Sequence, residues 1–172
     1  IAEFLKEYFH LASSIIFKHN GELDKFIGDG VMAIFGALNG RDAKGVEDAS
    51  FAALAALELK EEFKKLLDQW ITRWKDYSAQ VIDIGVGCGL HTGDCLVGNV
   101  GTEIRDQFTA LGADVNLAAR IEARTKKEQI LVSASTHSRL SERFNFETKE
   151  IINDIKNIPG DYQVYELLSP RY

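Results

Sequence analysis

A carboxylate and a cation lie close together in residues 22–36, which read E-L-D-K-F-I-G-D-G-V-M-A-I-F-G. An Asp-Gly step between two apolar runs favours a β-hairpin, so this stretch predicts strands near 22–28 and 31–36 with Asp29 at the turn. Lys25 lies four residues before Asp29 on the incoming strand. An aspartate at such a turn is usually only a turn former, and the alternative is that it binds a metal ion.

A second polar pair, Asn116 and Arg120, lies four residues apart in a segment that predicts a helix over 114–124. Residues at this spacing share one face of a helix, so both side chains can act on the same ligand. Thr109 ends the glycine-rich segment 85–109, which precedes this helix. Taken singly, each of these polar residues has an ordinary alternative, because charged side chains on helices and hairpins are usually only solvated.

The other segments supply the framework that must position these residues. Apolar residues at helical spacing predict helices over 1–19 and 47–76, joined through the first hairpin and a polar loop. Residues 80–90 are rich in Val, Ile and Gly and predict a strand that turns back into a second strand over 95–100.

The last third of the chain predicts short alternating elements. These are an extended piece at 108–111, a strand at 129–133, a short helix capped by Ser133, and strands within 144–167 that end with 162–167. The sum is an α+β domain with a ferredoxin-like core, in which helices cover a mainly antiparallel sheet. No strand precedes the first helix, which is one strand fewer than this core requires.

The bulk composition is that of one ordinary globular domain, with 45% hydrophobic and 27% charged residues. The net charge of -6 argues against general nucleic-acid binding. No apolar run approaches the ~20 residues that span a bilayer. The chain begins without Met inside a predicted helix, so we expect an excised piece of a longer protein. Cys88 and Cys95 are expected to be reduced thiols rather than a disulfide.

Three stretches, in the same order and at the same spacing, resemble the catalytic domain of the class III nucleotidyl cyclases over nearly all of residues 1–167. D-K-F-I-G-D-G-V-M-A-I-F-G resembles the metal-binding hairpin of that family. I-G-V-G-C-G-L-H-T-G-D-C-L-V-G-N-V-G resembles its central strand pair, and F-T-A-L-G-A-D-V-N-L-A-A-R-I-E resembles the segment that carries its catalytic Asn and Arg. Such a domain makes a cyclic nucleotide, and the bacterial-type adenylate cyclases are the most similar group.

The resemblance implies a role for each matching residue in converting ATP to 3′,5′-cyclic AMP and pyrophosphate. Asp29 would be one of two aspartates that hold two Mg²⁺ or Mn²⁺ ions, which serve the in-line attack of the ribose 3′-hydroxyl. Arg120 would stabilise charge on the reacting phosphorus, and Asn116 would orient the ribose. Lys156 falls at the position of the triphosphate-binding lysine, although the family's usual Gly after it is Asn157 here.

Lys25 and Thr109 resemble the base-binding pair of the bacterial-type adenylate cyclases. Adenine has an acceptor at N1 and a donor at N6; Lys25 can only donate, and the Thr109 hydroxyl can accept. Guanine reverses these edges, so a guanylate cyclase would be expected to carry an acceptor such as Glu in place of Lys25. The pair therefore favours ATP over GTP.

The resemblance also implies a homodimer with its active sites at the interface, in which Lys25 and Asp29 of one chain serve different sites. Catalytic domains of this family are linked to varied sensors, so we expect a covalently attached regulatory domain. The catalytic domain is expected to be cytoplasmic, whether or not the parent protein is anchored in a membrane.

Two departures from the family leave alternatives open. The first metal aspartate of the family lies on a strand before the first helix, so residues 1–172 alone are expected to have little or no cyclase activity. Gly30 replaces a more usual Ala and should only loosen the turn. The alternatives are a guanylate cyclase and a catalytically inactive nucleotide-binding or dimerisation module. A diguanylate cyclase is disfavoured because its Gly-Gly-Asp/Glu-Glu-Phe turn is absent.

Overall fold

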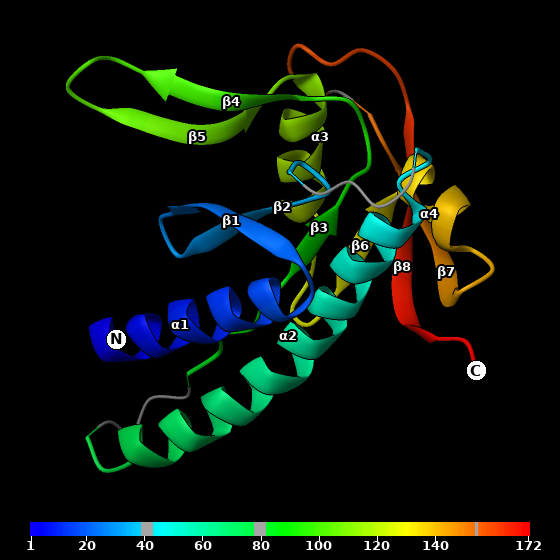
Figure 1. Ribbon diagram of the computed structural model, residues 1–172. Helices are drawn as coiled ribbons and strands as arrows, with labels where there is room; N and C mark the ends of the chain where they lie inside the picture. Colours follow the sequence, from blue (N-terminus) through cyan, green and yellow to red (C-terminus); the bar gives the residue numbers. More distant parts are fainter. Residues whose placement is uncertain (39–42, 78–81, 154) are drawn as a thin grey trace.

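The fold is that of a computed structural model, which describes residues 1–38, 43–77, 82–153 and 155–172. In these residues four helices pack against eight strands (Figure 1). The predicted α+β class is confirmed, and the described strand pairs are antiparallel apart from one parallel pair. No helix within the described ranges is long and apolar enough to cross a membrane.

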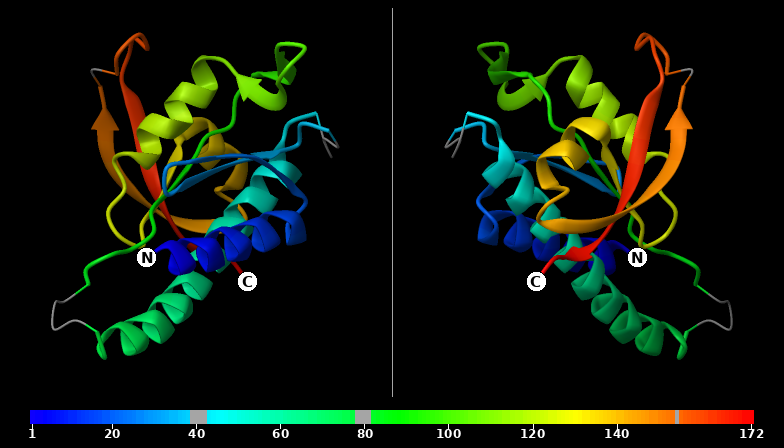
Figure 2. Two further views of the ribbon diagram at one scale, coloured as in Figure 1. Left: turned by 90° about the vertical axis from the view of Figure 1, so that its left-hand side faces the viewer. Right: turned by 90° about the vertical axis from the view of Figure 1, so that its right-hand side faces the viewer.

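The amino-terminal half consists of two helices and the predicted hairpin. Helix α1 (Ala2–Lys18) leads into β1 (Gly21–Ile27) and β2 (Gly30–Phe35), and α2 (Val46–Trp74) follows. Helix α1 buries its apolar stripe against α2, where the ring of Phe4 makes edge-on contacts with three aromatic residues, Phe63, Trp70 and Trp74. Figure 2 shows that α1 and α2 cross and that the second half of α2 extends away from the strands.

The main sheet has four strands in the order β3-β6-β8-β7. These strands are β3 (Cys88–Leu90), β6 (Ile130–Ser133), β7 (Phe144–Ile152) and β8 (Tyr162–Pro170). Every residue of β6 is buried, as expected for a strand that is covered on both faces.

Helices cover the two faces of this sheet separately. Ile130 and Val132 pack with α2 and with α4 (Ala134–Leu140), whereas Leu131 between them packs with α3 (Ala113–Glu122). Alternation of side chains along a strand explains this division. The sheet therefore fixes α3 on the face opposite α2 and α4.

The prediction that 80–90 and 95–100 form one hairpin is wrong. Strand β3 pairs in parallel with β6, and β4 (Leu96–Gly101) pairs instead with β5 (Asp106–Leu111). The β4–β5 hairpin reaches out from the body above β1 and β2 (Figure 1). Residues 80 and 81 of the predicted strand lie outside the described residues, and 82–87 are not in a strand.

The glycines of this segment explain the error. A Cβ atom on Gly89 would collide with the backbone nitrogen of Glu122, and one on Gly87 would collide with the side chain of Thr125. Glycine here permits close approach to the end of α3, which is one of the two usual meanings of glycine in a strand-like segment.

Candidate active site

Asp29 lies in the exposed turn between β1 and β2, where the sequence places it. Gly28 before it has a φ of 60°, a conformation that favours glycine. Burial, followed by the charge of Asp29, raises the pKa of Glu122 at the end of α3. Within the described residues the Asp29 side chain makes no hydrogen bond or ion pair, so its carboxylate is free to bind a ligand.

The donor chemistry at this turn suits a hard divalent cation, but only in part. Asp29 offers carboxylate oxygens, and Mg²⁺ sites in proteins often use one or two carboxylates together with phosphate oxygens. The two like charges of Asp29 and Glu122 also make the turn locally negative. Across the described ranges, no group of three or more His, Cys, Asp or Glu residues could hold a metal ion. Among the described residues, this turn could thus supply part of a set of metal ligands but not a complete set.

Lys25 and Thr109 come from different hairpins, and a third residue, Asp24, brings them together. The Thr109 hydroxyl donates to Asp24 Oδ1 at 2.9 Å and to Oδ2 at 2.8 Å. The backbone N–H of Ala110 donates to Oδ2 at 3.0 Å. The Lys25 ammonium lies 3.6 Å from Oδ1. The Asp24 side chain is 0% exposed and Thr109 is 4% exposed, so this cluster is a preformed part of the interior.

A β-bulge explains how the neighbours Asp24 and Lys25 come together. The register of β1 against β2 shifts between Leu23 and Lys25, which leaves Asp24 without a cross-strand partner. Consecutive side chains of a regular strand point to opposite faces, and a bulge interrupts that alternation. Asp24 was not among the predicted site residues, although a second carboxylate directly before Lys25 in the same strand was an available signal.

Asn116 and Arg120 lie on α3, as predicted. Both side chains are exposed, whereas Leu117 and Ile121 of the same helix are buried against the sheet. In the part of the chain that the structure describes, neither polar side chain has a hydrogen-bond or ion-pair partner. The shared helical face is therefore open to a ligand from outside.

Lys156 is exposed in the connection between β7 and β8, next to the bridge formed by Ile155 and Ile158. Asn157 has a φ of 64°. This left-handed conformation is most easily adopted by glycine, and Asn is one of the few other residues that tolerate it. Asn157 can thus occupy the position of the glycine that is usual in the family.

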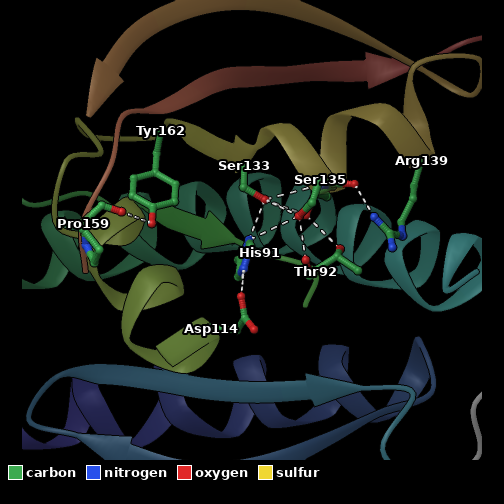
Figure 3. Close-up of polar contacts among 9 residues, drawn as sticks. His91, Thr92, Asp114, Ser133, Ser135, Arg139, Pro159 and Tyr162 are labelled. Atoms are coloured by element: carbon green, nitrogen blue, oxygen red, sulfur yellow. Dashed lines mark hydrogen bonds and ion pairs between the residues drawn. The ribbon is translucent and has the colours of Figure 1, made fainter. Parts of the chain in front are cut away.

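A further polar cluster surrounds His91, which lies between the predicted strands 80–90 and 95–100 and was not among the predicted site residues. Its Nδ1 lies 2.7 Å from the Ser133 hydroxyl, and its Nε2 lies 2.6 Å from Asp114 Oδ1 (Figure 3). The Ser135 hydroxyl donates to the carbonyl oxygen of Thr92 at 2.6 Å. No local sequence pattern predicts these contacts, because Ser133 is 42 residues and Asp114 is 23 residues away from His91 in the sequence.

The Ser–His–carboxylate order of this cluster resembles a hydrolase triad, but its surroundings fit a structural role. The Ser133 oxygen caps α4 by accepting a hydrogen bond from the N–H of Thr136, and Ser133 is buried. A nucleophile needs a free, accessible oxygen. The cluster instead ties the start of α3 to β3 and α4, and so positions the helix that carries Asn116 and Arg120.

The two cysteines are free thiols, as predicted. Burial raises the pKa of Cys88 to about 12, and the charge of Glu122 adds to the effect. Burial also raises the pKa of Cys95, and the charges of Asp114 and Asp94 raise this pKa further. Thiolates are the reactive and metal-binding form, so the raised pKa disfavours either thiol as a nucleophile or metal ligand.

The chain belongs to the adenylate and guanylate cyclase catalytic domain family, whose model matches residues 1–168. It is 34% identical over 140 residues to Adenylate cyclase 1 of Rhizobium meliloti, which covers 78% of this chain and 19% of that protein. The chain thus spans about a fifth of the length of this curated relative.

Solved structures agree with this family and with the predicted fold. The adenylyl cyclase CyaB from P. aeruginosa aligns with a TM-score of 0.87 and 31% identity, over 99% of this chain and 83% of that chain. The guanylyl cyclase Cya2 aligns with a TM-score of 0.81 and 27% identity, over 99% and 81% of the two chains. The predicted cyclase family and cyclase fold are confirmed, and both nucleotide specificities occur among the similar proteins.

Proposed function

We propose that residues 1–172 belong to a catalytic domain that, in the intact protein, converts ATP to 3′,5′-cyclic AMP and pyrophosphate. The observation that carries this proposal is the meeting of Lys25 and Thr109 at one buried carboxylate. The donor on Lys25 and the oxygen of Thr109 complement N1 and N6 of adenine. Guanine presents the opposite groups at these positions.

The exposed polar residues would bind the rest of the nucleotide. Arg120 would stabilise the negative charge that develops on the α-phosphoryl group, and Asn116 would orient the ribose. Lys156 would bind the triphosphate through its ammonium group. Their side chains are open to a ligand and lack partners in the described part of the chain, as this role requires.

Cyclases of this class use divalent metals. Asp29 would hold Mg²⁺ or Mn²⁺, two ions in a complete site, and such ions supply charge neutralisation for the triphosphate and activation of the 3′-hydroxyl. This assignment requires further ligands beyond the single carboxylate at the turn. Phosphate oxygens of ATP would be among them.

A second copy of the chain would complete each active site. The β4–β5 hairpin carries large apolar side chains in contact with solvent, of which Leu96 is 80% and Ile104 is 97% exposed. Exposed apolar patches are typical of interaction surfaces.

A linked regulatory domain is consistent with the fifth of the relative's length that this chain spans. We assign the catalytic domain to the cytoplasm.

An assay of cyclic AMP and cyclic GMP formation in the intact protein, with Mn²⁺ and each nucleotide, tests the function. We expect cyclic AMP from ATP, and we expect Asp29→Ala to abolish it. Preferred formation of cyclic GMP would make the domain a guanylate cyclase. Nucleotide binding without turnover would make it an inactive binding module. Activity that survives Asp29→Ala would contradict the metal assignment.

A further inference from the structure

We propose that Asp24 is a positioning residue that selects adenine by fixing the direction in which the Thr109 hydroxyl donates. Because it concerns how the same site distinguishes purines, this role rests on the proposed function. Asp24 would not touch the nucleotide, since its side chain is 0% exposed. It would act through the two base-binding residues that contact it.

The contacts of Asp24 hold its carboxylate in one orientation. Oδ2 accepts from the Ala110 N–H at 3.0 Å and from the Thr109 hydroxyl at 2.8 Å. Oδ1 accepts from the same hydroxyl at 2.9 Å and lies 3.6 Å from the Lys25 ammonium. Backbone, hydroxyl and cation thus all present hydrogens to this group. A buried carboxylate is tolerated when it is paired in this way.

The pairing determines what Thr109 can offer to a base. A hydroxyl has one proton and two lone pairs, and an ionised carboxylate can only accept. The Thr109 proton is therefore committed to Asp24, and the oxygen keeps only acceptor capacity for a ligand. Such an oxygen can accept from the amino group at adenine N6, but it can donate nothing to the carbonyl oxygen at guanine O6.

Asp24→Asn tests this role because the side chain keeps its shape. The Ala110 N–H requires an acceptor, so the amide oxygen takes that position and the amide nitrogen faces Thr109. The nitrogen, at the former Oδ1 position, donates to the Thr109 oxygen and so competes with adenine N6 for its lone pairs, while the hydroxyl proton keeps one acceptor, the amide oxygen, in place of two. We expect the ratio of kcat/KM for ATP to that for GTP to fall about tenfold, the effect of about one hydrogen bond.

Asp68→Asn is the matched control, because Asp68 is exposed on α2. It should leave the nucleotide ratio unchanged. If Asp24 only stabilised the packing of β1 against β5, Asp24→Asn would lower the unfolding temperature and leave the ratio of kcat/KM for ATP to that for GTP unchanged. That result would overturn the role of Asp24.

Thr109→Val provides a second test that does not depend on the folding of Asp24→Asn. It should weaken ATP binding about tenfold and leave the binding of GTP and inosine triphosphate within about twofold. An equal loss for ATP and inosine triphosphate would show that the hydroxyl can turn toward O6, and would overturn the proposal. In the Thr109→Val background, Asp24→Asn should cause no further change in the ratio.

The unmodified protein separates this proposal from the proposed function. Preference for GTP, or turnover of neither nucleotide, contradicts the adenylate cyclase itself. Preference for ATP that is unchanged by Asp24→Asn in a folded protein contradicts only the role of Asp24.

Discussion

The residues proposed to bind the base, Lys25 and Thr109, differ from Asp29 and Arg120, which are proposed to act at the phosphates, in how many contacts within the chain hold their side chains. Lys25 and Thr109 are joined through Asp24, which is buried and accepts hydrogen bonds from two groups of β5. Asp29 and Arg120 are exposed and have no hydrogen-bond or ion-pair partner among the described residues.

The difference follows from the cost of burying polar groups. A buried carboxylate must be paired inside the protein, whereas an exposed guanidinium or carboxylate is satisfied by water until a ligand arrives. Asp24 and Thr109 are therefore held by contacts within the chain before any ligand binds. Asp29 and Arg120 lack such contacts among the described residues, and their proposed partners are a cation and the nucleotide.

The largest expected effect is on catalysis, through the residue proposed to act on the reacting phosphoryl group. Arg120→Ala should lower kcat about 100- to 1000-fold, because it removes a donor to the transition-state charge. The unfolding temperature should stay the same, since the side chain is exposed. Steady-state kinetics and thermal unfolding measure the two effects, and Arg124→Ala, one turn later, is the matched control. If Arg120→Ala lowered the unfolding temperature and left kcat unchanged, Arg120 would be a structural residue like Asp24, and the proposed difference between the two groups would be wrong.

The next effect is on stability at the base end. Asp24→Ala should lower the free energy of unfolding by about 1–3 kcal/mol, because the Ala110 N–H and the Thr109 hydroxyl lose their buried acceptor. Asp29→Ala should change it by less than about 0.5 kcal/mol, as is usual at an exposed position. Urea unfolding of both variants gives the comparison. Equal losses would mean that the Asp29 turn is as tightly held as the Asp24 cluster.

The smallest effect concerns the backbone beside Lys156. Asn157→Ala should cost about 1 kcal/mol, because alanine tolerates the positive φ poorly. Asn157→Gly should be neutral or slightly stabilising. Urea unfolding of the two variants separates backbone conformation from loss of the Asn side chain. A similar cost for both would show that the side chain, and not the backbone, holds this turn.

Local patterns in the sequence were sufficient for the elements that are defined by local contacts. Periodicity predicted α1, α2 and α3, and the Asp-Gly step predicted the β1–β2 hairpin. The predicted pairing of β3 was wrong, because its partner β6 is far away in the sequence and the glycines in and before β3 serve close packing against the end of α3. A parallel pair of this kind has no turn signal that links its strands.

The candidate site shows the same limit. Lys25, Asp29, Asn116 and Arg120 were identified from short continuous motifs, one covering the β1–β2 hairpin and the other covering β5 and α3. Asp24 was missed because its partner Thr109 is 85 residues away. Hydrogen bonds of this range depend on how the two hairpins pack, and no periodicity of either strand encodes that packing.

The junction between β5 and α3 has a consequence for the shape of the substrate. Strand β5 carries Thr109, helix α3 carries Asn116, and Gly112 with a φ of 138° is the single residue between the two elements. If Thr109 contacts the purine and Asn116 the ribose, as proposed, one continuous stretch of backbone sets the distance between these two contacts. Gly112 is the one flexible point in this stretch, which would therefore constrain the length of the nucleoside that binds and not the length of its phosphate chain.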